Sequence, residues 1–141
     1  EYHPIKAKKT LANAIQIGNP VSINKAIKIL KKFEGIVEQA TEDELANAAA
    51  LADTTGLFNC PHTGVALAAL FKLAKRKQIK KDERIVIIST ALGLKFTEFK
   101  IRYHENKLEG VKPKHVNLPV ELPPDYKRVK DTIMKRLEGG L

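Results

Sequence analysis

The chain has 141 residues, of which 43% are hydrophobic, and carries 25 Lys and Arg against 16 Asp and Glu, a net charge of +9. This length is enough for one compact core, since domains commonly run to about 100–150 residues. No apolar run approaches the roughly 20 residues of a membrane span, and the first residues lack an apolar signal region. The single cysteine excludes an intramolecular disulfide. We therefore expect a soluble, intracellular protein with no membrane partner.

The positive charge is unevenly distributed along the chain. Residues 34–71 contain six acidic residues and no Lys or Arg, whereas residues 72–84 contain seven basic ones. No aromatic residue is interleaved with the basic cluster at 75–77, so the stacking surface of a single-strand binder is not evident. We expect only weak, nonspecific contact with nucleic acid, and a solvated helix end explains the cluster equally well.

The first third of the chain predicts one amphipathic helix and one short strand. Residues 10–17 fit either a short helix or an extended segment, and Gly18 to Pro20 form a break. Apolar residues then recur at helical spacing over 23–30, with lysines off the stripe. Residues 36–40 are partly β-branched and follow a glycine, which indicates a strand.

A helix is expected from about residue 42 to the break at Gly56. Thr41 and Glu44 have the spacing of a capping box, in which each side chain binds the backbone N–H of the other residue. The acidic residues at 42–44 also suit metal ligation or acid–base chemistry, but capping and the helix dipole explain all three.

A thiol, an imidazole and a hydroxyl, at Cys60, His62 and Thr63, come just before a largely apolar helical run at 64–73. That run predicts a buried helix whose N-terminal N–H groups suit a phosphate or carboxylate. Cys60 and His62 are two residues apart, so their side chains diverge, which argues against a nucleophile and base pair. No zinc spacing occurs, and we expect no metal. His62 fits either a structural hydrogen bond or a pocket lining.

The central feature is the aliphatic run 85–88, which leads directly into Ser89 and Thr90. An unbroken Val/Ile run predicts a strand that is covered on both faces, as in a parallel sheet. Side chains at the carboxyl ends of such strands converge on a crevice, so Ser89 and Thr90 are candidate site residues, although strand termination and helix capping explain them too. With the strand at 36–40, the pattern is a right-handed βααβ crossover.

The remaining sequence predicts a helix over 93–104, a Pro-rich connector over 108–124 and a terminal helix over 124–137. The expected fold is α/β: a small three-layer-like domain with a short parallel sheet flanked by helices. We divide the chain into a partial domain at 1–106, and a connector with a C-terminal helix packed on that domain at 107–141.

Three stretches resemble plant-type threonine synthase, in the same order as in that family. Residues 89–96 read Ser-Thr-Ala-Leu-Gly-Leu-Lys-Phe, close to the family's Ser-Thr-Ala-His-Gly-Leu-Lys-Phe. The other two are residues 14–22 and 58–67. The resemblance runs from about Lys6 to about Asn106 and matches only the C-terminal portion of the family, whose members are fold-type II enzymes. They use pyridoxal phosphate to convert O-phosphohomoserine and water into threonine and phosphate.

The resemblance implies positions for part of a cofactor site. It places Thr90 at the pyridine nitrogen, with Ser89 beside it. It also places a pocket lining at Asn19 and at Pro61, His62, Thr63 and Gly64. The family's lysine motif, of the His-Thr-Gly-Ser-Phe-Lys-Asp type, and its glycine-rich phosphate loop do not occur here. Leu92 stands where the family usually has histidine, so any polar role of that position is lost.

These observations leave three functional hypotheses. The chain is a C-terminal fragment or truncated relative of threonine synthase, not catalytically competent alone and without bound pyridoxal phosphate. It is otherwise a small binding protein that reuses this half-fold, or, less favoured, a basic nucleic-acid binder. Expected partners are the missing N-terminal part of the enzyme, another partner chain or an anionic small molecule. The resemblance to the plant family implies a plastid location.

Overall fold

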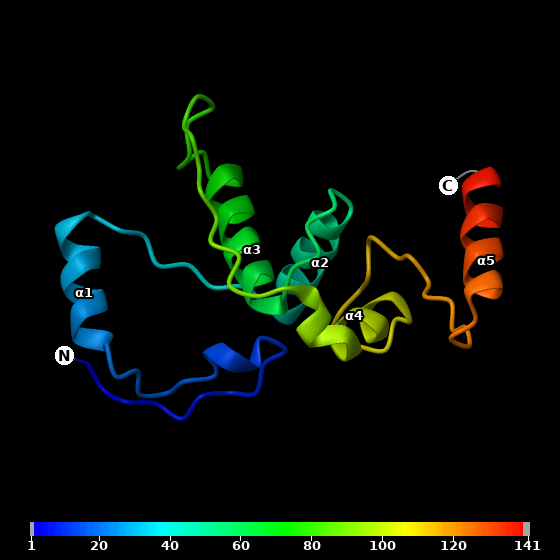
Figure 1. The fold of residues 1–141 in the computed structure, drawn as a ribbon. Coiled ribbons are helices and arrows are strands. Elements are labelled where there is room, and N and C mark those ends of the chain that lie inside the picture. The colour runs from blue at the N-terminus through cyan, green and yellow to red at the C-terminus, as the bar shows by residue number, and fades with distance from the viewer. Residues whose placement is uncertain (1, 140–141) are drawn as a thin grey trace.

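The computed structural model describes residues 2–139 and is built from helices joined by long extended segments (Figure 1). Five α-helices are described, with two short 3-10 helices that precede α1 and α4: η1 (Asn13–Ile15), α1 (Ile23–Lys32), α2 (Glu42–Asp53), α3 (Pro61–Lys75), η2 (Gly93–Phe96), α4 (Thr97–His104) and α5 (Tyr126–Glu138). Helices α2 and α3 pack together at the centre, whereas α1 and α5 lie at opposite ends of the molecule (Figure 1). No helix between residues 2 and 139 is long and apolar enough to span a membrane.

The predicted α/β fold is wrong: the described residues contain no sheet, and their only β-type pairing is an isolated bridge between Asn59 and Leu92. The expected strands at 36–40 and 85–89 are extended but unpaired. Their apolar side chains are exposed, with Val37 at 77% and Val86 at 87% of full exposure. A β-strand forms only where a second strand takes its backbone hydrogen bonds, and residues 2–139 supply no such strand.

The helix predictions at the centre of the chain are confirmed because their signals are local. Helix α2 begins at Glu42 with both hydrogen bonds of the capping box, Glu44 N–H to Thr41 Oγ1 at 3.2 Å and Thr41 N–H to Glu44 Oε2 at 2.8 Å. It ends before Gly56, whose φ of +88° suits glycine. Helix α3 begins at Pro61, three residues before the expected start at Gly64, because Cys60 caps it and proline is favoured in a first turn.

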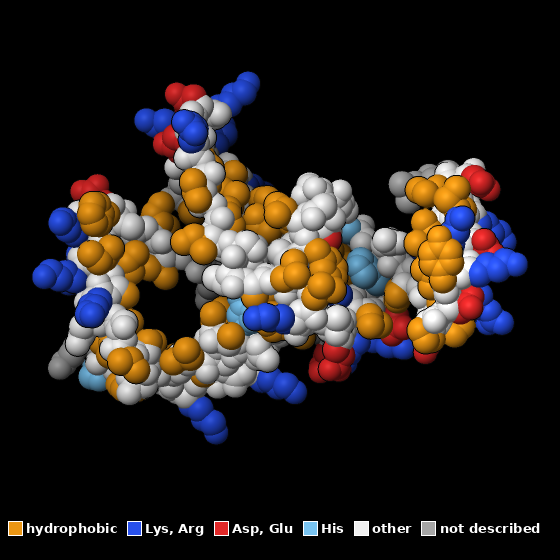
Figure 2. All heavy atoms as spheres, in the orientation of Figure 1, with side chains coloured by type: hydrophobic (Ala, Val, Ile, Leu, Met, Phe, Trp, Pro, Cys, Tyr) orange, Lys and Arg blue, Asp and Glu red, His pale blue; other side chains and the backbone are white. Residues whose placement is uncertain are grey.

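A small core joins α2 to α4 and to two loops. Its buried residues are Ala12, Leu45, Ala46, Ala50, Tyr103, Leu108 and Val111. The terminal helices α1 and α5 contribute no buried residue, and Figure 2 shows hydrophobic side chains spread over the visible surface. The fold is therefore fixed mainly around α2, α3 and α4, and that region also positions the candidate site.

Helices α2 and α3 approach each other closely at Gly64. A Cβ atom at this position would lie 2.4 Å from the carbonyl oxygen of Leu45 and 3.1 Å from the Cβ of Ala49. Only a residue without a side chain allows this contact, so Gly64 sets the distance between the two helices.

Replacing Gly64 with alanine is expected to lower the free energy of unfolding by about 1–3 kcal/mol, because the two helices must separate to admit the methyl group. Urea denaturation followed by circular dichroism measures the change. The matched variant Ala66→Ser, at a half-buried position of the same helix, is expected to change the same quantity by less than about 0.5 kcal/mol. Unchanged stability in Gly64→Ala would contradict the close approach.

Candidate functional site

Four hydroxyl and thiol groups meet at the N-terminal end of α3. The Sγ atom of Cys60 lies 3.2 Å from Thr63 Oγ1 and 3.6 Å from Thr90 Oγ1, and Thr63 Oγ1 lies 3.3 Å from Ser89 Oγ. Cys60 and Thr63 are buried, whereas Ser89 and Thr90 are exposed. We call these four residues the hydroxyl cluster. The structure thus brings together three predicted site residues, Thr63, Ser89 and Thr90, and places Cys60 beside them.

The cluster favours the charged form of Cys60. Burial opposes the thiolate, but the Thr63 hydroxyl and backbone N–H, the Thr90 hydroxyl and His62 all stabilise it, and together they lower the pKa of Cys60 to about 6. The Thr63 N–H group donates to Sγ at 3.4 Å, which is also the N-cap interaction of α3. A thiol at such a helix end is commonly acidic, because unpaired N–H groups favour negative charge there.

His62 lies at the edge of the cluster in a structural hydrogen bond. Its Nε2 atom accepts the N–H of Ala14 at 2.9 Å, and its ring packs edge-on against Phe96 with centroids 5.2 Å apart. His62 thereby ties the N-terminal segment and η2 to the start of α3.

The other nominated residues lie outside the hydroxyl cluster. Asn19 contacts the N-terminal segment, where its Oδ1 accepts the hydroxyl of Tyr2 at 3.4 Å. Pro61 is buried in the first turn of α3, and Gly64 packs against α2. The structure gives Pro61 and Gly64 roles in forming and packing the helix that carries the cluster.

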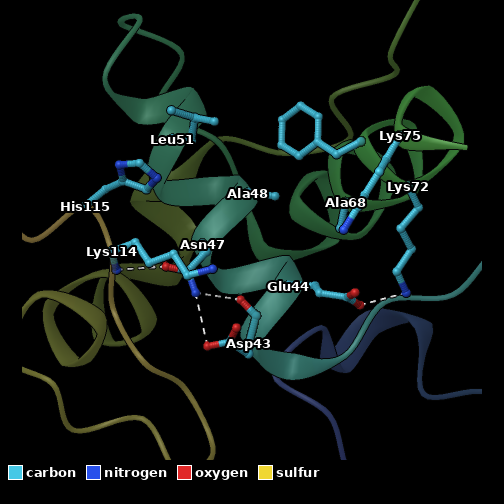
Figure 3. Close-up of a pocket in the computed structure, with 11 residues that line it drawn as sticks. Asp43, Glu44, Asn47, Ala48, Leu51, Ala68, Lys72, Lys75, Lys114 and His115 are labelled. Carbon is cyan, nitrogen blue, oxygen red and sulfur yellow. Dashed lines mark hydrogen bonds and ion pairs between the residues drawn. The ribbon is translucent and has the colours of Figure 1, made fainter. Parts of the chain in front are cut away.

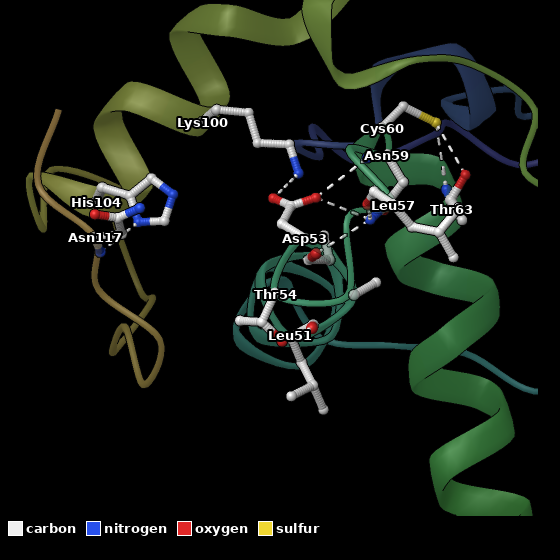
Figure 4. A network of polar contacts seen from close by, with 12 residues as sticks. Leu51, Asp53, Thr54, Leu57, Asn59, Cys60, Thr63, Lys100, His104 and Asn117 are labelled. Carbon is white, nitrogen blue, oxygen red and sulfur yellow. Dashed lines mark hydrogen bonds and ion pairs between the residues drawn. The ribbon is translucent and has the colours of Figure 1, made fainter. Parts of the chain in front are cut away.

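A buried ion pair holds the loop before Cys60 in place (Figure 4). The Nζ atom of Lys100 on α4 lies 2.5 Å from Oδ2 of Asp53 at the end of α2. The other oxygen, Oδ1, accepts the backbone N–H and the side-chain amide of Asn59, at 3.2 and 3.1 Å. Burial lowers the pKa of Lys100, and the Asp53 carboxylate opposes that shift. One carboxylate therefore connects α2, α4 and the residue that precedes Cys60.

Asn59 and its neighbour Phe58 also contact the segment that follows Thr90. Asn59 forms the isolated β-bridge with Leu92, and Gly93 N–H donates to the Phe58 carbonyl at 2.9 Å. Thr90 lies two residues before Leu92, so the Asp53–Lys100 pair fixes both segments that meet in the cluster. Sequence reasoning missed Asn59 and Lys100, because no local pattern distinguishes a buried lysine from a solvated one.

The ultraviolet absorbance of the Cys60 thiolate is expected to titrate with a midpoint near pH 6 in the folded chain, against about 8.5 for an ordinary cysteine. Cys60 is the only cysteine, so the signal is unambiguous. Thr63→Val removes a hydroxyl donor and should raise the midpoint, whereas Thr97→Val, at an exposed position away from the cluster, should not. A wild-type midpoint near 8.5 would contradict the proposed hydrogen bonding.

The same shift predicts how stability depends on pH. A pKa that is lower in the folded state than in the unfolded state gives stabilisation that is complete above the unfolded value and is lost as pH falls through the folded value. The Cys60 contribution should therefore decline as pH falls from about 8.5 to about 6, and Cys60→Ser should remove that part of the pH dependence in urea denaturation.

Lys100→Met is expected to lower the free energy of unfolding by about 3–5 kcal/mol, because it leaves the Asp53 carboxylate buried without its cation. Asp53→Asn in the same chain should recover part of the loss, and urea denaturation of the single and double variants gives the coupling energy. The control is Glu98→Gln, which breaks the exposed Glu98–Arg102 pair and should cost less than about 1 kcal/mol. Additive single effects would show that the two side chains do not act as a pair.

Comparison with known proteins gives a consistent assignment. The family model described as pyridoxal-phosphate dependent enzyme matches residues 1–91. The chain is 50% identical over 140 residues to chloroplastic threonine synthase 2 of Arabidopsis thaliana, in an alignment that covers 99% of this chain and 27% of that protein. It is 38% identical over 107 residues to threonine synthase of Methanocaldococcus jannaschii, covering 75% of this chain and 26% of that enzyme.

The similarity extends to bacteria, with 32% identity over 110 residues to threonine synthase of a Bacillus species, covering 77% of this chain and 31% of that enzyme. The chain thus spans less than a third of the length of these relatives. The resemblance that the sequence motifs indicated is confirmed, and with it pyridoxal phosphate as the cofactor of the parent family. The chain belongs to the family of pyridoxal-phosphate dependent enzymes.

Proposed function

We propose that this chain supplies one side of the cofactor site of a threonine synthase, which converts O-phosphohomoserine and water into threonine and phosphate. The observation that carries the proposal is the hydroxyl cluster, in which Ser89 and Thr90 meet the start of α3. Its members come from two of the three stretches that resemble the family. The similarity to threonine synthases supports the choice of reaction.

The residues present fit one part of pyridoxal phosphate. A neutral hydroxyl at Thr90 is a suitable hydrogen-bond partner for a pyridine nitrogen, and Thr90 is exposed enough to meet one. Asn59 Oδ1 is buried and has no hydrogen-bond partner among the described residues, which is consistent with a site that further groups complete.

The residues present do not provide a binding site for the phosphate group of pyridoxal phosphate, or a lysine that would bind the cofactor covalently. In the first turn of α3, Pro61 has no N–H group, and the N–H groups of Thr63 and Gly64 already bind Cys60. The expected anion site at this helix end is therefore largely occupied by the helix cap. No lysine of residues 2–139 donates a hydrogen bond to the cluster. The phosphate and lysine contacts must come from other residues.

Pyridoxal phosphate, when bound, supplies an electron-withdrawing ring that stabilises negative charge at the reacting carbon of an amino acid. In the proposed site the Thr90 hydroxyl would donate to the ring nitrogen, with Cys60 in its thiol form donating to Thr90 Oγ1, and this neutral partner would leave the nitrogen less protonated than a carboxylate does. Cys60 and Thr63 orient the Thr90 and Ser89 hydroxyls through the contacts of the cluster. Asp53 and Lys100 hold the loop that carries Cys60.

The proposal assigns the lysine and phosphate contacts to a partner chain or to sequence beyond these 141 residues. Two exposed apolar segments, 36–37 and 85–88, support association with another polypeptide. Large exposed apolar patches commonly mark such interfaces. By analogy with the chloroplastic relative, we also propose that the protein works in a plastid.

The purified chain, incubated with pyridoxal phosphate and O-phosphohomoserine, is expected to form no threonine. Borohydride reduction followed by peptide mapping should show no adduct, or scattered adducts on surface lysines. Co-expression with the part of the Arabidopsis relative that the chain does not cover is expected to give threonine and phosphate. A stoichiometric adduct at one lysine with turnover by the chain alone would overturn the division of roles.

The contribution of Thr90 is tested in that complex. Thr90→Val should lower kcat about tenfold, the equivalent of one lost hydrogen bond of about 1–1.5 kcal/mol, and Thr90→Ser should restore most of the rate. Thr97→Val is the matched control. A complex that forms but makes no threonine would favour the alternative, a binding protein that reuses this half-fold.

A further inference from the structure

A groove lies between α2 and α3 (Figure 3), and none of the residues of the hydroxyl cluster lines it. It is formed by the C-terminal half of α3, the outer face of α2 and the loop at 112–115, and its volume is about 380 Å³. This volume is within the range of about 300–1,000 Å³ that is typical of small-molecule sites.

One wall of the groove is held by buried polar groups. Tyr103 and Asn47 are buried, and the Tyr103 hydroxyl donates to Asn47 Oδ1 at 2.8 Å. The backbone N–H groups of Lys114 and His115 donate to the Tyr103 hydroxyl at 3.1 and 3.2 Å. Lys112 N–H donates to Asp43 Oδ1 at 2.8 Å. The loop therefore docks on α2 in one fixed position, so the groove exists before any ligand binds.

The floor of the groove is apolar and partly aromatic. The buried residues Ala48 and Ala68 line it, together with Leu51 and Phe71, which are 40% and 43% exposed. A flat apolar or aromatic group that enters between Leu51 and Phe71 would remove both side chains from water, which is favourable at about 25 cal/mol per Å² of apolar surface.

The charge around this floor is positive and only partly neutralised. Lys72 is already paired, with Glu44 at 2.7 Å and with the Gln39 carbonyl at 2.8 Å. The ammonium groups of Lys75 and Lys114 have no acceptor among the described residues. The Asp43 carboxylate also lines the groove and keeps its negative charge, with only its Oδ1 atom accepting from Asn47 and the Lys112 N–H, so the three lysines outnumber the two carboxylates of the lining by one. Two ammonium groups are thus free to receive an anion at the edge of an apolar floor.

We infer that this groove binds a small aromatic anion, an aryl carboxylate or aryl phosphate, with its ring between Leu51 and Phe71 and its charge on Lys75 and Lys114. The site is independent of the proposed cofactor site, which lies at the opposite end of α3. It does not require the partner polypeptide, because residues 43–115 supply every group involved.

The test is a nuclear magnetic resonance titration of the full chain with phenyl phosphate, benzoate, inorganic phosphate and neutral benzyl alcohol. Phenyl phosphate or benzoate is expected to give saturable shifts at the groove residues with a Kd of about 1 mM or tighter. The stronger of the two identifies which anionic group the site prefers. Inorganic phosphate and benzyl alcohol, each lacking half of the recognition, should bind at least about tenfold more weakly.

Three variants separate the contributions. Lys75→Met and Lys114→Met should each weaken binding of the anionic ligand about fivefold, and Phe71→Ala should weaken phenyl phosphate but not inorganic phosphate. Lys81→Met, an exposed lysine that does not line the groove, is the matched control and should leave the Kd unchanged. The amide spectra of the variants show directly that they fold.

Two results would overturn the inference. Equal weakening by Lys81→Met and Lys75→Met would show nonspecific attraction by the basic surface. Equal affinity for benzyl alcohol and phenyl phosphate, or shifts that do not saturate, would show general apolar binding in place of an anion site. Neither result would affect the proposed cofactor role of Thr90, which is measured at the other end of α3.

Discussion

The Asp53 carboxylate is the group on which the candidate site depends. It accepts from Lys100 on α4 and from two N–H groups of Asn59, so this one side chain joins α2 to two other segments. A largely buried carboxylate is tolerated when it is paired and hydrogen-bonded, and here Lys100 of α4 supplies the charge while Asn59 supplies both N–H donors. The result is geometric: the residues before Cys60 and those after Thr90 are held in a single arrangement. Lys100 is further enclosed by the rings of Phe58 and Phe99, 5.0 and 5.7 Å from its Nζ atom.

Helix α3 separates two kinds of chemistry. Its N-terminal turn is polar, capped by Cys60 and tied to Ser89 and Thr90, whereas its C-terminal half presents Phe71 and lysines to the groove. Gly64 packs this helix closely against α2 near the first turn. The two proposed sites therefore lie at opposite ends of one helix, which also packs against α2.

The sequence predicted the elements whose signals are local. The capping box at Thr41 and the stop at Gly56 act within a few residues of the two ends of α2, and the structure confirms both. The prediction of strands at 36–40 and 85–89 was wrong, because a strand needs a second strand to pair with and an apolar run does not specify one.

The candidate site shows the same division between local and non-local information. Motif resemblance nominated Thr63, Ser89 and Thr90, which the structure brings together, but also Asn19, which lies elsewhere. The sequence showed Cys60 only as a thiol just before a helical run, and its role as the cap of α3 and as a member of the cluster came from the structure. The Asp53–Lys100 pair joins residues 47 positions apart, and no spacing rule reaches that far.

The exposed aliphatic segments explain why the proposed cofactor site needs another polypeptide, whereas the proposed groove site does not. Val37, Val86 and Ile88 retain 77%, 87% and 75% of their surface in contact with water. Fully burying one such side chain contributes about 1.5–3 kcal/mol, so another polypeptide that covered these segments would be held tightly. Ser89 and Thr90 directly follow the longer segment, so any chain that covers it also reaches the hydroxyl cluster. Association and completion of the cofactor site are then one event. The groove contains none of these segments, and its recognition is complete without association.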